Sequence, residues 1–140
     1  AQFFLGDGGS YLLGAFIAVS VIKTSIANPL ISPFYFCLLL YYLFFEVFFS
    51  FIRKSIIKTK HPLVPDRKHL HMLLYEVLYK KNNKKLVSNY YVSIIINSIY
   101  LILIIPGILF MSNGMFCKYY GAALILAYIF FYKIIYEKAQ

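Results

Sequence analysis

Residues 90–111 decide the fold class, because they read YYVSIIINSIYLILIIPGILFM and contain no charged side chain. A run of about 20 apolar residues is long enough for a helix to cross the hydrocarbon core of a bilayer. Hydrophobic residues make up 61% of the 140-residue chain, and its mean hydropathy is +0.73. These long uncharged runs exclude a soluble globular domain. We therefore predict an all-α integral membrane protein.

Similar apolar runs occur elsewhere in the chain, and together they predict about four transmembrane helices. A turn rich in proline, Asn28 to Pro33, separates the first two, and Pro106-Gly107 is expected to kink the third. We interpret residues 1–140 as a single membrane domain whose predicted spans are about 11–27, 34–52, 90–111 and 119–136.

The positive charges indicate the orientation. Ten of the 14 lysines and arginines lie in one connection, about 53–88, between the second and third predicted spans. By the positive-inside rule this loop and the C-terminus are cytoplasmic. The segment before the first span then faces the cytoplasm too, because two spans carry the chain out and back.

The net charge of +9 indicates anionic partners. Since the charges flank membrane spans instead of covering a soluble face, we expect membrane lipids and phosphorylated ligands, and no nucleic acid. Most of the basic residues are explained by topology alone.

A glycine-rich segment precedes the first span and reads Gly6-Asp7-Gly8-Gly9-Ser10. Glycines permit positive φ and close approach of backbone N–H groups to an anion, and Ser10 is placed to cap the following helix. Asp7 is then a hard oxygen ligand for Mg²⁺ carried on a diphosphate. The alternative is that the segment is only a turn and a cap.

The basic loop contains Pro-Asp-Arg-Lys-His-Leu-His at residues 65–71. We predict one helix here, with Asp66 as its N-cap residue and its end at residues 80–83. It is expected to be an amphipathic surface helix, because apolar residues recur at helical spacing: Leu70, Leu73, Leu74, Val77 and Leu78.

Histidines lie in the first turn of this predicted helix. His69 and His71 would point about 200° apart on a helix, so they are not expected to chelate one ion. Phosphate contact through Arg67 and His69 at the helix N-terminus fits better. The alternative is that the histidines are ordinary polar residues at the membrane interface.

Taken in order, the glycine segment, a second span with Glu46 seven residues before Arg53, and the segment ending His69-Leu70-His71 resemble a known family. They resemble the C-terminal portion of the polyprenyl-phosphate N-acetylhexosamine-1-phosphate transferases (glycosyltransferase family 4), from Phe3 to about Leu74. The spaced histidines are similar to the undecaprenyl-phosphate N-acetylglucosamine-1-phosphate transferase branch, which initiates cell-surface glycans.

The resemblance implies roles for individual residues. Asp7 is implied to be a catalytic Mg²⁺ ligand, and His69 and His71 are implied to be catalytic residues of a loop that closes over the diphosphate and sugar. The implied substrate-binding residues are Gly8, Gly9, Ser10, Arg53 and Arg67. The chain departs from the family pattern at Met72, where another histidine is common, and at Glu46, where aspartate is usual. An alternative for Glu46 is a half-buried carboxylate paired with Arg53.

The reaction implied by the resemblance transfers N-acetylhexosamine-1-phosphate from a UDP-sugar to polyprenyl (undecaprenyl) phosphate and releases UMP, at the cytoplasmic face of a bacterial inner membrane. The family also uses an upstream Asp-Asp motif, which these residues lack, so we expect the chain to be inactive alone. The choice of hexosamine and glycan and the formation of a homodimer stay open.

Two other classes of protein compete with the transferase. One is a small four-span transporter or flippase subunit in which Glu46 is the membrane carboxylate that couples protons to a substrate. The other is a structural membrane subunit whose basic loop binds phospholipid. Neither needs the glycine segment (residues 6–10) or residues 65–71, which we call the histidine segment.

Overall fold

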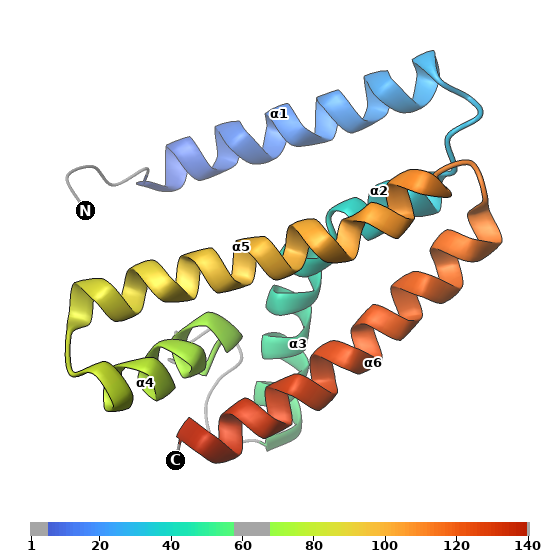
Figure 1. Cartoon of the computed structure of the whole chain (residues 1–140). Coiled ribbons are helices and arrows are strands. Elements are labelled where there is room, and N and C mark those ends of the chain that lie inside the picture. Colours follow the sequence, from blue (N-terminus) through green and yellow to red (C-terminus); the bar gives the residue numbers. More distant parts are fainter. Residues whose placement is uncertain (1–5, 58–67, 140) are drawn as a thin grey trace.

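The computed structural model describes residues 6–57 and 68–139, and all regular secondary structure within these ranges is helical. Three helices, the first and the last two, are long and apolar enough to cross a membrane, and the second and third together form a bent fourth candidate. This confirms the predicted all-α membrane fold class. The helices, drawn in Figure 1, are α1 (Gly6–Ala27), α2 (Pro33–Leu39), α3 (Tyr41–Ile57), α4 (Leu70–Asn82), α5 (Lys85–Leu109) and α6 (Gly114–Ala139).

The segment predicted as a span over about 34–52 consists of two helices, α2 and α3, that meet at an angle of 70°. Ser32 caps α2 by accepting the Phe34 N–H at 3.3 Å, and the helix ends at Leu40. The Tyr100 hydroxyl of α5 donates to the Leu39 carbonyl at the break. The sequence did not indicate this bend, which is stabilised because a side chain from a neighbouring helix supplies the hydrogen bond that the bend removes from α2 and α3.

The close packing of α2 on α5 depends on Gly107. A Cβ atom added there would lie 2.5 Å from the Leu38 side chain, so a larger residue would force that side chain to shift. Leu38 is 2% exposed. It packs in a cluster with Ile104 and Cys117 that joins α2, α5 and α6.

The α1–α2 and α5–α6 links lie at one end of the molecule, and the α4–α5 link lies at the opposite end (Figure 1). At one end the Ser32 N–H donates to the Met111 carbonyl at 2.9 Å, which ties the α1–α2 link to the α5–α6 link. At the other end Lys80 of α4 donates to the Ala139 carbonyl of α6 at 2.6 Å. The start of α1, the α4–α5 link and the end of α6 therefore lie toward the same end (Figure 1).

The helix of the basic loop begins later and packs more deeply than the sequence predicted. α4 starts at Leu70 with His69 as its N-cap residue, so the predicted start at Asp66 was wrong; Asp66 itself lies outside the described residues. The helix ends at Asn83 in the left-handed conformation, as its Asn-Asn sequence favours. On its apolar side, Leu73 packs into a cluster with aromatic residues of α3 and α6. α4 is therefore packed against other helices of the protein and does not only lie on the surface.

Candidate functional site

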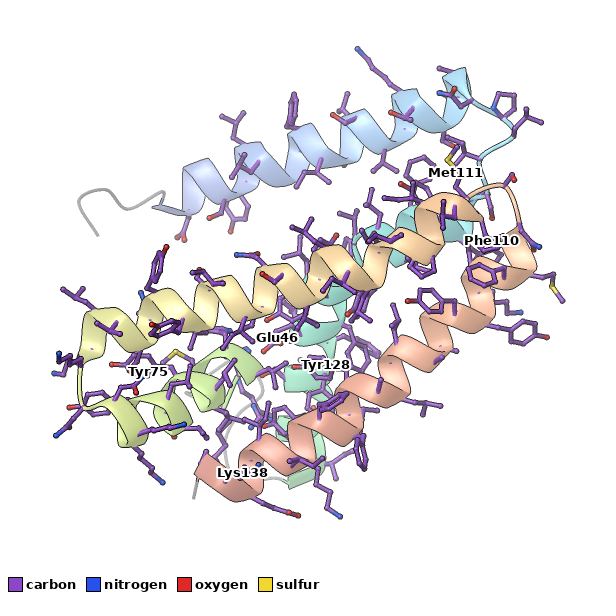
Figure 2. All side chains as sticks on the ribbon, viewed as in Figure 1. Glu46, Tyr75, Phe110, Met111, Tyr128 and Lys138 are labelled. Carbon is purple, nitrogen blue, oxygen red and sulfur yellow. The ribbon has the colours of Figure 1, made fainter. Side chains whose placement is uncertain are left out.

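Glu46 of α3 is the centre of a polar site between α3, α4 and α6. Its side chain is buried, at 8% exposure, and one carboxylate oxygen accepts the Leu70 backbone N–H at 2.8 Å. The other oxygen accepts the Tyr128 hydroxyl at 2.6 Å. Figure 2 shows Glu46 and Tyr128 pointing toward one another where α3 and α6 meet. A carboxylate from another helix thus caps the N-terminus of α4, where the helix dipole favours negative charge.

The histidine segment is held at this carboxylate. His69 Nδ1 lies 3.2 Å from the Glu46 oxygen that also accepts the Leu70 N–H. The His69 and His71 rings are stacked with centroids 5.7 Å apart. The prediction that they point about 200° apart was wrong, because His69 is an extended N-cap residue with ψ 150° and is not in the helix.

His71 is exposed to solvent at the rim of the site. Partial burial lowers the pKa of His71 below its ordinary value; the negative charge of Glu46 raises it in part, and His69 lowers it further. His71 is therefore a neutral imidazole at pH 7, able to donate from one ring nitrogen and accept at the other.

Arg53, at the end of α3, lies beside the same site. Its guanidinium donates to the Ser50 hydroxyl at 3.3 Å and lies over the Tyr132 ring of α6, 5.7 Å from the ring centroid. Stacking of this kind keeps the charge while fixing the side chain. Arg53, His69 and His71 are thus gathered around α3, α4 and α6. Arg67, the other cation predicted to bind substrate, lies outside the described residues.

The glycine segment has a different structure from the predicted turn. α1 already begins at Gly6, which has φ 65°, and the next residues form its first turn. The Ser10 hydroxyl donates back to the Gly6 carbonyl at 2.9 Å, so Ser10 is inside the helix and is not its cap. The turn was predicted wrongly because glycines tolerate the first helical turn, where backbone N–H groups need no helical partner. Gly8 and Gly9 lie in this first turn.

Asp7 stands alone at the start of α1. Its side chain is exposed and forms no hydrogen bond or ion pair with another described residue. The described ranges contain no group of three or more His, Cys, Asp or Glu side chains placed to hold a metal ion. One carboxylate and the phosphates of a substrate are nevertheless a usual set of Mg²⁺ ligands. Asp7 thus fits a single ligand to Mg²⁺, whereas the oxygens of Glu46 already accept hydrogen bonds.

An apolar cavity of about 440 Å³ adjoins the Glu46 site. Side chains of α3, α4, α5 and α6 line it, among them Tyr42, Leu70, Ile99 and Tyr128. Leu70 and Tyr128 also contact Glu46, so the polar site and the cavity share a wall. The arrangement can hold an apolar chain next to a group of cationic and imidazole side chains.

The α6 residues of this site were missed by the sequence analysis, which assigned no motif to the last two spans. Tyr128, Tyr132 and Tyr136 recur every four residues, and this spacing places them on one face of a helix. The spacing could have identified them as a set, although their partners on α3 and before α4 could not be read from it.

The fold and the site define a class: a helical membrane protein in which a buried carboxylate holds a segment containing histidines and cations against the membrane helices. Over 71 residues the chain is 38% identical to undecaprenyl-phosphate alpha-N-acetylglucosaminyl 1-phosphate transferase of Thermotoga maritima. The match covers 51% of this chain and 23% of the relative. No protein-family model and no solved structure matches the chain. The similarity confirms, for part of the chain, the resemblance that was predicted from the sequence.

Proposed function

We propose that the chain is part of an enzyme that transfers N-acetylhexosamine-1-phosphate from a UDP-sugar to a polyprenyl phosphate. In this reaction a phosphate oxygen of the lipid attacks the β-phosphorus of the UDP-sugar, a new phosphorus–oxygen bond forms, and the bond to UMP breaks. The product is a lipid-linked sugar that starts a cell-surface glycan. The observation that carries the proposal is the 38% identity over 71 residues to the Thermotoga maritima transferase.

The residues of the described site suit this chemistry. Phosphoryl transfer depends on positioning and on neutralising negative charge, which cations and imidazole N–H groups provide. Arg53 and His69 are held by α3 and α6, and His71 is exposed beside them. Arg67, which precedes His69 and His71 in the chain, is assigned the same role. Bound Mg²⁺ would supply further charge neutralisation at the diphosphate, with Asp7 as its protein ligand.

The apolar cavity suits the hydrocarbon part of the lipid substrate. Its walls are almost entirely aliphatic and aromatic, and it adjoins the polar groups that would contact the phosphate. The active face is assigned to the cytoplasm of a bacterial inner membrane, because UDP-sugars are cytoplasmic and the basic loop belongs on that side.

A transferase assay tests the proposal. Membranes that contain the full-length protein are supplied with UDP-N-acetylglucosamine labelled in the sugar, undecaprenyl phosphate and Mg²⁺. We expect labelled lipid and UMP in equal amounts, and no product after EDTA treatment. Lipid-linked label without UMP would contradict the proposed bond cleavage.

Proton-coupled uptake in the same membranes tests the transporter alternative. The hydrogen bonds of Glu46 weigh against it, since a coupling carboxylate must exchange protons with water and Glu46 is 8% exposed. Uptake that depends on Glu46, without lipid-linked product, would replace the transferase proposal.

A further inference from the structure

Three tyrosines form a continuous row along the C-terminal half of α6. Tyr128, Tyr132 and Tyr136 are separated by four residues each, so they lie on one face of the helix. Their rings stack in sequence, with centroids 6.2 Å apart for the first pair and 6.0 Å for the second. We call these three residues the tyrosine row.

Two hydroxyls of the tyrosine row bond directly to Lys68, just before α4, and the third bonds to Glu46, which accepts the first N–H of α4. Tyr136 accepts the Lys68 ammonium group at 3.2 Å, and the Tyr132 hydroxyl donates to the Lys68 carbonyl at 2.9 Å. The Tyr128 hydroxyl donates to Glu46, which in turn accepts the Leu70 N–H. The row therefore holds the residues on both sides of His69, across more than 60 residues of sequence.

The hydroxyls are not needed for packing. Tyr128 and Tyr132 are each 7% exposed and lie in the same cluster as Leu73, where phenylalanine would fill the space equally well. A buried hydroxyl is unfavourable unless it forms a hydrogen bond. Tyrosine at these positions thus indicates a function for the oxygen atoms, two of which bond Lys68 directly while the third bonds Glu46.

The row also positions Arg53, whose guanidinium lies over the Tyr132 ring. Tyrosines such as Tyr132 are typical of the aromatic belt at a membrane interface. The Tyr132 hydroxyl instead points to a backbone carbonyl of the protein. One face of α6 therefore contacts two of the groups that we assign to substrate, Arg53 and the His69 segment.

We propose that the tyrosine row is a positioning element that fixes His69 and Arg53 in the geometry required for the diphosphate-sugar. The claim that His69 and Arg53 are positioned for substrate rests on the proposed function. The claim that the tyrosine row orders residues 68–74 does not. The tyrosines act through other residues and do not contact the reacting atoms.

Hydrogen exchange of the peptide that covers residues 68–74 tests the structural part without any activity. Tyr132→Phe removes one hydroxyl and little volume. We expect amide exchange in this peptide to become roughly fivefold faster, because the lost hydrogen bond stabilises the closed segment. Tyr128→Phe is expected to have a similar effect through Glu46.

Tyr120→Phe is the matched control. Its hydroxyl donates to the Leu103 carbonyl at 2.9 Å, the same kind of bond at the same distance on the same helix, but toward the other end of the molecule. Exchange in residues 68–74 should be unchanged in this variant. Equal exchange in the Tyr132 and Tyr120 variants would overturn the proposal.

Kinetics of the full-length enzyme test the part that concerns substrate. We expect Tyr132→Phe to lower kcat roughly fivefold with less than a twofold change in KM for the UDP-sugar, while Tyr120→Phe leaves both constants unchanged. A purely structural role would lower the amount of folded enzyme and leave kcat per folded molecule unchanged, and that result would overturn the proposal. If the full-length protein has no transferase activity but Tyr132→Phe still speeds amide exchange in residues 68–74, the proposed function is rejected and the ordering role of the tyrosine row is retained.

Discussion

Two carboxylates, Asp7 and Glu46, are in opposite environments. Asp7 is exposed in the first turn of α1, a helix that buries none of its residues. Glu46 is 8% exposed and meets donors from three residues on α6 and at the start of α4. A carboxylate with free lone pairs is available to a metal ion, whereas one whose oxygens are occupied fixes structure. We therefore propose different roles for the two acids, in which Asp7 acts on substrate and Glu46 stabilises the fold of the site.

The largest expected effect is on catalysis by Asp7→Asn in the full-length protein. Loss of one charged Mg²⁺ ligand should lower the rate on the order of 100-fold or more, by the magnitudes known for electrostatic stabilisation of transition states. The thermal unfolding midpoint should change little, since Asp7 has no partner among the described residues and contributes only to the helix dipole of α1. Near-normal turnover at saturating Mg²⁺ would remove Asp7 from the site.

Glu46→Ala, in contrast, should mainly lower the free energy of unfolding. The substitution leaves the Leu70 N–H and the Tyr128 hydroxyl without their acceptor in a buried place, at a cost of about 2–4 kcal/mol. Thermal unfolding in detergent measures this loss.

Glu46→Gln is the matched control for shape. Its amide oxygen keeps one acceptor, so about half of the loss should be recovered. If Glu46→Ala unfolds at the wild-type temperature, Glu46 does not stabilise the fold and the proposed difference in role between Asp7 and Glu46 is contradicted.

Substitutions in the histidine segment should give intermediate effects on catalysis. Arg67→Ala and His69→Ala should each lower kcat/KM for the UDP-sugar by roughly 30-fold, because a desolvated contact to a phosphate is worth about 2–4 kcal/mol. Lys84→Ala, a change of an exposed lysine at the N-cap of α5, should alter kcat/KM little. Equal small losses for all three variants in steady-state kinetics would mean that the loop is only a basic anchor.

The sequence predicted the fold class and the end of α4 for good physical reasons. Uncharged apolar runs such as residues 90–111 have few alternatives to a membrane helix. The end of α4 followed from Asn82-Asn83, since asparagine accepts the left-handed conformation found at Asn83. These features depend on local chemistry, which a single sequence contains.

The features that the sequence did not predict depend on contacts between distant residues. The break at Leu40 has no proline or glycine to mark it; it is stabilised by Tyr100, which is 61 residues away from Leu39. The start of α4 is capped by Glu46, a residue of another helix. The tyrosine row has a visible period, but its bonds to Lys68 and Glu46 arise only when α6 packs against α3 and α4.

The smallest expected effect is the pH dependence contributed by His71. Its pKa is lowered in the folded protein, chiefly by burial, whereas in the unfolded chain the ordinary value of about 6.5 applies. The unfolded chain therefore binds the proton more readily, and stability falls as the pH decreases from about 6.5 toward the lower pKa of the folded state. Above pH 7 both states are neutral at His71 and the contribution is constant.

His71→Asn should flatten the decrease of the unfolding midpoint between pH 7 and pH 5 without changing it at pH 8. The other titrating groups are common to both proteins, so the difference between the two curves isolates His71. Parallel curves would show that His71 has the same pKa in both states, and would place it in open solvent, away from the Glu46 site.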